Sequence, residues 1–204
     1  MPWAPPYATA AELRSFIADG TTGSETELNL AIETASRSVD RATNRQFGKV
    51  DGIESRWYEA SFDSSNLFGP RRRWTVDIDD IMVADGMVVE FGDGAEVSGE
   101  PLTGVIPTPV NAVVNGRPWT KLLLPQGVSG GSAIRITGLF GWAAVPDAIK
   151  LATMIQASRL FARRHAPFGI LGSPETGGEL RLLERLDADL MTSVRPYVRM
   201  WGAV

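Results

Sequence analysis

Residues 24–46 of the chain read SETELNLAIETASRSVDRATNRQ and predict a long helix. Ser24 and Glu27 can form a capping box, in which each side chain accepts a hydrogen bond from the backbone N–H of the other residue. Apolar side chains then recur at alternating spacings of four and three, which gives a narrow seam suited to packing on another helix. The seam consists of Leu28, Ile32, Ala35, Val39 and Ala42. We expect this helix to run to about Gln46 and to end at Phe47 and Gly48.

A different face of the same helix carries Arg37, Arg41 and Arg45, each one turn beyond the last. Such a row is most often a solvated helix face. It could also meet an acidic surface of a neighbouring subunit, so these arginines are candidate subunit-interface residues. The basic run Arg71, Arg72 and Arg73 is a second candidate for the same role, and its simple alternative is a solvated loop tip.

Helices are also expected on either side of this region. Thr9 and Glu12 form another capping box, which predicts a helix that starts at Thr9. Pro146 is a favourable first helical residue and Asp147 suits the first turn, so they predict a further helix. That helix is apolar over most of its circumference, so we expect it to be central to a bundle. Pro196 should end or kink a short last helix.

The middle of the chain, residues 51–142, predicts antiparallel strands. Asn115-Gly116 indicates a hairpin turn, and Asp85-Gly86 and the Gly92 to Gly94 stretch are further turn candidates. The β-prone runs are 56–59, 74–78, 87–91, 112–114, 119–124 and 134–137. Short strands separated by turns favour a small sandwich or a curled sheet.

Together these patterns predict an α+β fold. Residues 1–50 and 143–204 would form a small helical bundle, and residues 51–142 would be a β-rich insertion. The length of 204 residues suits one domain of ordinary size, or one domain with a sizeable insertion.

Composition excludes several kinds of chemistry. The chain has no cysteine, which excludes disulfides, thiolate metal sites and cysteine nucleophiles, and it has one histidine, His165. The formal net charge of −4 does not suit a polycation that coats nucleic acid. The N-terminus has no targeting segment and no apolar stretch is long enough for a bilayer, so we expect a reducing cytoplasm and no membrane.

Three features could carry chemistry, and each has a simpler interpretation. The acidic side chains Asp77, Asp79, Asp80 and Asp85 could bind a hard cation, but they are better explained as strand-end and turn residues. The 169–178 loop lacks the Lys-Ser/Thr that a phosphate-binding loop needs. A histidine at a helix C-terminus, such as His165, is usually a cap. We therefore expect no enzyme activity, no metal and no cofactor.

The C-terminal tail is apolar and aromatic, whereas chain ends are usually polar. Tyr197, Met200 and Trp201 lie beside Arg195 and Arg199, and these residue types are enriched at the centres of protein interfaces. Asp187 should cap the helix that precedes them. The tail therefore predicts a partner interface, and the alternative is a tail folded back onto its own core.

The helical parts resemble the head-to-tail connector, or adaptor, proteins of long-tailed double-stranded DNA bacteriophages. The resemblance covers roughly the outer halves of the chain, and the entry Gly141-Trp142 to Val145-Pro146 is its most distinctive piece. The other stretches are 7–13, 31–40, 43–47, 149–152, 157–164, 186–190 and 194–197.

This resemblance implies a structural role in the virion neck, assembled in the host cytoplasm. Such proteins form a dodecameric ring under the portal protein, extend the DNA channel, and receive a stopper or tail protein below. Double-stranded DNA would pass through the lumen, during packaging and ejection, without sequence-specific binding. By analogy, residues of about 187–204 would dock on the portal, which makes Asp187, Arg195, Tyr197, Arg199, Met200 and Trp201 the portal-interface candidates.

Two other functions remain open at this point. The chain could be a nucleic-acid-binding accessory module that uses Arg71 to Arg73 and the Arg163-Arg164 pair, with an affinity for DNA that falls steeply with salt. It could also be a hydrolase that uses His165 or the aspartates.

Overall fold

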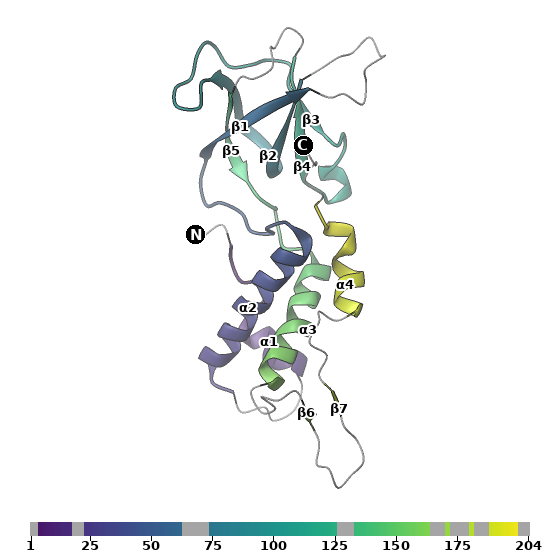
Figure 1. Ribbon diagram of the computed structural model, residues 1–204. Coiled ribbons are helices and arrows are strands. Elements are labelled where there is room, and N and C mark those ends of the chain that lie inside the picture. Colours follow the sequence, from purple (N-terminus) through teal and green to yellow (C-terminus); the bar gives the residue numbers. More distant parts are fainter. Residues whose placement is uncertain are drawn as a thin grey trace. The chain divides into compact units, whose positions relative to one another are not determined.

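The computed structural model describes residues 4–17, 23–62, 74–125, 133–163, 170–171, 180–181 and 188–199. The chain divides into two compact units (Figure 1). A helical unit contains Ala4–Phe47 and the described residues from Val145 onward, and a β unit contains Gly48–Ala144. The fold is α+β, with an antiparallel sheet inserted between N-terminal and C-terminal helices that pack together, which confirms the predicted class.

In the helical unit, helix α3 shares the central position with α2, which also packs against each of the other three helices, whereas the apolar circumference of α3 predicted that α3 is central. Helix α3 itself packs against each of the other three helices. The helices are α1 (Ala10–Ile17), α2 (Glu25–Thr43), α3 (Asp147–Arg163) and α4 (Ala188–Val194), and a single 3-10 turn, η4 (Arg195–Tyr197), follows α4. Helix α4 ends at Val194, and Pro196 lies in η4, which confirms the predicted effect of this proline.

Both predicted capping boxes are present. Ser24 accepts from the Glu27 backbone N–H at 3.3 Å, while Glu27 accepts from the Ser24 N–H at 2.9 Å. The seam of α2 is buried at Leu28, Ile32, Ala35 and Val39. Its predicted end was wrong, because Asn44 adopts a left-handed conformation, with φ of 50°, and closes the helix directly after Thr43.

The β unit is a curled five-stranded antiparallel sheet. Its order is β1-β5-β2-β4-β3, and β1 also pairs with β2, so β1, β5 and β2 pair with one another in a closed circuit. The strands are β1 (Glu54–Phe62), β2 (Trp74–Gly92), β3 (Ile106–Thr108), β4 (Trp119–Leu123) and β5 (Ala133–Phe140). Strand β2 allows this closure by changing partners: its beginning pairs with β1 and β4, and its later part pairs with β5.

The predicted turn at Asp85-Gly86 lies inside β2 and does not separate two strands. Gly86 has a positive φ of 73°, and the register with β5 shifts between Val83 and Val88. The glycine therefore bends one long strand. The turn expected at Gly92 to Gly94 is confirmed, since the Asp93 side chain accepts the backbone N–H groups of the two residues after Gly94.

The hairpin predicted at Asn115-Gly116 is present, because the consecutive strands β3 and β4 pair antiparallel and residues 109–118 form the loop between them. The strand predicted at 112–114 is wrong. These residues form a 3-10 turn, η2 (Val113–Asn115), closed by Gly116 with a positive φ of 66°. The prolines on either side, Pro109 and Pro118, lack the N–H groups that would extend the β3–β4 ladder into this loop.

The two ends of the β unit are paired with each other. Val50 donates its backbone N–H to the Phe140 carbonyl at 3.0 Å, and Trp142 donates to the Gly48 carbonyl at 3.0 Å. Gly141 lies between these two bonds with a positive φ of 115°. A Cβ at this position would lie 2.2 Å from the Gly48 carbonyl oxygen, so only glycine fits the crossing without displacing the backbone.

A short ladder in the third region was not predicted. Strands β6 (Ile170–Leu171) and β7 (Leu180–Arg181) pair antiparallel where the sequence indicated only a loop. Among the helices in the described residues, none has the length and apolar character needed to span a bilayer.

Candidate interaction surfaces

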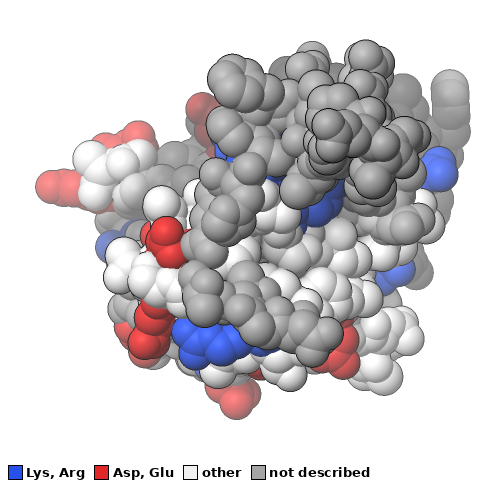
Figure 2. All heavy atoms as spheres, turned by 90° about the horizontal axis from the view of Figure 1, so that it is seen from below, with Lys and Arg blue, Asp and Glu red and all other residues white. Residues whose placement is uncertain are grey.

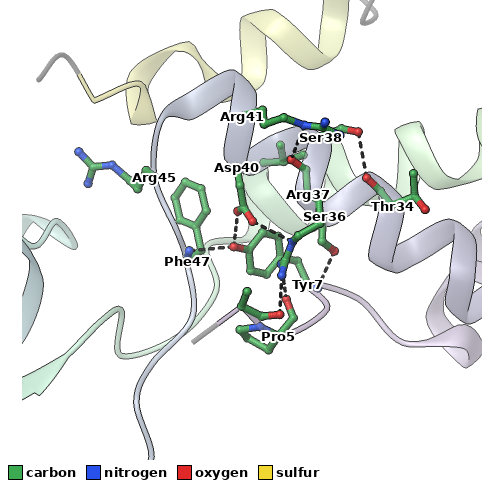
Figure 3. A network of polar contacts seen from close by, with 12 residues as sticks. Pro5, Tyr7, Thr34, Ser36, Arg37, Ser38, Asp40, Arg41, Arg45 and Phe47 are labelled. Atoms are coloured by element: carbon green, nitrogen blue, oxygen red, sulfur yellow. Dashed lines mark hydrogen bonds and ion pairs between the residues drawn. The ribbon is translucent and has the colours of Figure 1, made fainter. Parts of the chain in front are cut away.

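A buried polar network fixes the N-terminal segment on α2 (Figure 3). The Tyr7 hydroxyl donates to Oδ1 of Asp40 and accepts the backbone N–H of Phe47 at 2.9 Å. The Tyr7 N–H donates to Ser36 Oγ at 3.1 Å. Tyr7, Ser36 and Phe47 are almost completely buried, so these bonds hold the N-terminal segment, α2 and the chain after α2 together.

Arg37 is part of this network. Its Nε lies 2.9 Å from Asp40 Oδ2, and its two terminal nitrogens donate to the backbone carbonyls of Ala4 and Pro5 at 2.5 and 2.8 Å. The guanidinium also lies over the Tyr7 ring, with 5.6 Å between Cζ and the ring centroid. The contacts of Arg37 therefore stabilise the helical unit of the chain itself. The arginine row had instead suggested Arg37 as a contact with a neighbouring subunit.

Burial dominates the titration of this network. It raises the pKa of the Asp40 carboxyl, and the hydrogen bond from Tyr7 and the charges of Arg37 and Arg41 oppose it. Burial, with the adjacent Asp40, also raises the pKa of the Tyr7 phenol far above its ordinary value. The phenol thus remains a neutral donor to the carboxylate at any ordinary pH.

The three arginines of the predicted row have different environments. Arg41 is exposed, and its Nε donates to the Arg37 carbonyl at 3.3 Å. Arg45 follows the end of α2 and lies apart from the other two in Figure 3. The row is therefore not one uniform basic face. Arg71, Arg72 and Arg73 lie outside the described residues.

The C-terminal segment rests on the helical unit as far as residue 199. Leu190 and Val194 are fully buried. The Tyr197 ring makes an edge contact with Phe47, with 5.8 Å between ring centroids and 75° between planes. Arg199 donates its N–H to the Thr43 carbonyl at 2.8 Å and is 8% exposed. This matches the alternative interpretation, in which the tail folds back on its own core.

The described residues near the C-terminus nevertheless leave a surface open. Arg195 is exposed, and the apolar side chains of Met191 and Val198 are 39% and 36% exposed. Of the predicted portal-interface residues, Arg195 is thus exposed, Tyr197 is half-buried and Arg199 is buried. Asp187, Met200 and Trp201 lie outside the described residues.

The aspartates on β2 that could have formed a cation site each contact different partners. Asp80 is buried and accepts from Trp142 Nε1 at 2.7 Å. Asp79 accepts from Arg56 at 2.7 Å and from the Tyr58 hydroxyl at 2.9 Å, and Asp77 lies 3.5 Å from Lys121 Nζ. These residues lie within strand β2, not at strand ends or turns as predicted. Because successive side chains of a strand point to opposite faces of the sheet, Asp79 and Asp80 lie on different faces.

One ion pair joins two helices of the helical unit at its surface. Glu12 caps α1 through Oε2, which accepts from the Thr9 backbone N–H at 2.8 Å, and its Oε1 accepts from Lys150 Nζ on α3. The Lys150 hydrogen bond, with the bonds from Thr9, lowers the pKa of Glu12 to about 2.

Sequence reasoning missed an exposed apolar segment in the β unit. Val110 and Val114 are 67% and 86% exposed, and Ile106 on the edge strand β3 is 39% exposed. All three lie within residues 101–116, a stretch without a charged residue. The absence of charged residues in this stretch could be recognised in the sequence, but it does not show which side chains are exposed.

Charge is mixed on the part of the surface that Figure 2 shows. The described Lys and Arg side chains lie among Asp and Glu side chains and form no continuous basic area on this face. Arg163 ends α3, whereas Arg164 and His165 lie outside the described residues. No group of three or more histidine, aspartate or glutamate side chains suited to a metal ion occurs in the described ranges.

Comparison with known proteins adds no assignment. No protein-family model matches the chain, and no curated protein gives a significant match.

Proposed function

We propose that the chain is a structural head-to-tail adaptor of a phage virion, which forms a ring under the portal protein, extends the DNA channel and joins the capsid to a stopper or tail protein. It would act by fitting against neighbouring proteins and would not transform a substrate. Its place would be the neck, after assembly in the host cytoplasm.

One observation carries this proposal. The residues that resemble the connector family include those that hold the helical unit together. Tyr7, Asp40 and Phe47 form the buried network of this unit, and Trp142 donates to Asp80 within the β unit. Further resembling residues fill the core, namely Ala31, Ile32, Ala35, Val39, Ile149, Ala152, Ala157, Phe161, Leu190 and Val194. Packing residues specify a fold, and fold-level likeness is the support offered for the role.

The charged side chains also support a scaffold. Arg37, Asp40, Arg56, Asp79 and Asp80 all form contacts inside a unit, where they brace one element against another. The described surface offers large apolar side chains on both units. Exposed apolar groups favour protein partners, and a negative net charge favours a conduit that does not retain DNA.

The test is a deletion of residues 195–204 in the phage genome, followed by a count of tailed virions. We expect filled heads without tails, because the deletion removes Arg195, the exposed member of the described portal-interface candidates, and the segment that holds it in place. Normal virions would contradict the docking role.

A DNA-binding assay addresses the accessory-module alternative. We expect no measurable affinity at low salt. Binding that weakens steeply as salt rises would instead favour the nucleic-acid-binding module.

A further inference from the structure

Asn115-Gly116 is the one place in the chain where a glycine directly follows an asparagine. The carbonyl carbon of an asparagine side chain can be attacked by the backbone nitrogen of the next residue. Glycine permits this reaction best, because it has no Cβ to shield its nitrogen or to restrict the backbone. The pair lies in the loop between β3 and β4, and both residues are exposed.

The surroundings of this pair are open. A Cβ placed on Gly116 would meet nothing within 4 Å. The Asn115 side-chain amide makes no hydrogen bond within the part of the chain that the structure describes. The amide can therefore turn toward the Gly116 nitrogen without the loss of a contact.

One hydrogen bond must open before the attack can occur. The Gly116 N–H donates to the Val113 carbonyl at 3.0 Å and closes the 3-10 turn η2. A bond of this kind is weak, because 3-10 turns have poor hydrogen-bond geometry and helix ends fray. Local opening at an exposed turn can therefore release the Gly116 nitrogen while the strands of the β unit stay paired.

The other asparagines among the described residues are less suited to this reaction. Asn111 is exposed in the same loop, but the residue after it, Ala112, carries a Cβ and is 5% exposed. Asn29 lies within α2, and the Asn44 side chain donates to a backbone carbonyl at 3.5 Å. Within the described ranges, an exposed asparagine with an unengaged side chain and a following glycine occurs at Asn115 alone.

We propose that Asn115 is a site of spontaneous deamidation. The Gly116 backbone nitrogen gives its proton to a base in the solvent and bonds to Cγ of Asn115, while the bond from Cγ to Nδ2 breaks. The side-chain nitrogen takes a proton from the solvent and leaves as ammonia. One water molecule then opens the resulting five-membered imide at either of its carbonyls, which gives aspartate or isoaspartate.

The modification would change the loop in two ways. Either product adds a negative charge to residues 101–116, a stretch without a charged residue. Isoaspartate also inserts one methylene into the backbone before Gly116, where the 2.9 Å bond from the Arg117 N–H to the Ala112 carbonyl depends on the backbone path. The inference is independent of the proposed function, because it requires neither a ring nor a portal.

Peptide mass spectrometry of the full chain tests the site directly. The folded chain is incubated at pH 7 and at pH 9 in water enriched in a heavy oxygen isotope, which marks conversions that occur during the incubation. Asn111 is the matched internal control, because it is exposed in the same loop and lacks a following glycine. We expect conversion at 115 to be at least about tenfold faster than at 111, with both aspartate and isoaspartate as products, and faster at pH 9. Equal conversion at the two sites, or none at 115, would overturn the inference.

The same measurement on the urea-unfolded chain shows whether the folded loop permits the reaction. We expect the folded chain to convert position 115 within about tenfold of the unfolded rate, because the turn opens locally. A folded rate more than a hundredfold lower would mean that the hydrogen bond to Val113 protects Gly116, and the inference would fail. Asn115→Gln should abolish the signal at this position, because its longer side chain cannot close the five-membered ring.

Discussion

The hydroxyl of Tyr7 donates to the Asp40 carboxylate while it accepts the backbone N–H of Phe47. One atom thereby links the N-terminal segment, the last turns of α2 and the chain that leaves α2. Phe47 in turn contacts Tyr197 near the C-terminus. The described residues near both ends of the chain are thus held in the helical unit through one buried aromatic group.

Removal of that hydroxyl should destabilise the helical unit. In Tyr7→Phe, the Phe47 N–H loses its acceptor and the Asp40 carboxylate loses the hydrogen bond from the phenol. Of the network contacts described above, Asp40 then retains the one with Arg37. A buried group left without its hydrogen bond costs about 1–3 kcal/mol. We expect a loss of that size, measured by hydrogen exchange in α2 and by urea unfolding.

Tyr58→Phe is the matched control. Tyr58 also donates to a carboxylate, that of Asp79, but it belongs to the β unit. We expect its effect on exchange to be confined to the β unit. Equal exchange of α2 in Tyr7→Phe and the unmodified chain would contradict the role given to the hydroxyl.

The Glu12 carboxylate should make stability depend on pH in the acid range. Folding lowers its pKa from 4.5 to about 2, so the unfolded chain binds the proton more readily between these values. Its contribution is complete above pH 4.5 and is lost as the pH falls toward 2. Because Glu12 is 38% exposed, solvent screening limits this contribution to about 1 kcal/mol or less.

The measurement is the difference in unfolding free energy between the unmodified chain and Glu12→Gln, at pH 6 and at pH 3. The difference should shrink at pH 3, and the subtraction removes the titration of Asp40 and other groups. Lys150→Met keeps the cap at Thr9 but removes the ion pair, so it should retain part of the pH dependence. A difference that is the same at both pH values would refute the account.

Gly141 should tolerate alanine poorly. Its φ is 115°, and a Cβ would approach the Gly48 carbonyl oxygen at 2.2 Å and Lys49 Cα at 2.6 Å. Gly94 has a similar φ of 100° with nothing within 4 Å, so Gly94→Ala measures the backbone strain alone. We expect Gly141→Ala to cost at least about 2 kcal/mol more than Gly94→Ala, because steric overlap adds to strain. Thermal unfolding of the two variants gives the comparison, and equal losses would be inconsistent with the close backbone crossing.

The contact between Tyr197 and Phe47 should hold the C-terminal segment. An edge-to-face aromatic pair contributes about 0.5–1.5 kcal/mol beyond its buried area. In Tyr197→Ala we expect faster exchange of the Arg199 N–H, which donates to the Thr43 carbonyl. Val198→Ala, at a more exposed neighbour, should leave that exchange unchanged. Unchanged exchange in Tyr197→Ala would mean that the ring contact does not secure the segment.

The features that could be predicted from sequence are those set by near neighbours in the chain. The boxes at Thr9 and Ser24 need partners only three residues away, and the seam of α2 needs only its own periodicity. Asn115-Gly116 marks the loop of the β3–β4 hairpin, as predicted, but the strand expected at 112–114 is a 3-10 turn, because Pro109 and Pro118 cannot donate to a ladder there.

The candidate site was harder to predict, because its contacts are distant in sequence. Tyr7 and Asp40 are 33 residues apart, and no local pattern pairs them. Trp142 and Asp80 are 62 residues apart. The uncharged run at residues 101–116 could be recognised in the sequence. The exposure of its side chains depends on the order of the strands in the sheet, which the sequence does not reveal.

The central claim is that the chain works by assembling with neighbours at a portal. Its most direct test is the mass of the complex formed when the purified chain is mixed with the portal protein of the same phage, measured by native mass spectrometry or light scattering. The account predicts a discrete complex in which many copies of the chain share one portal. A portal that remains bare beside a monomeric chain, at concentrations far above those in the infected cell, would contradict it.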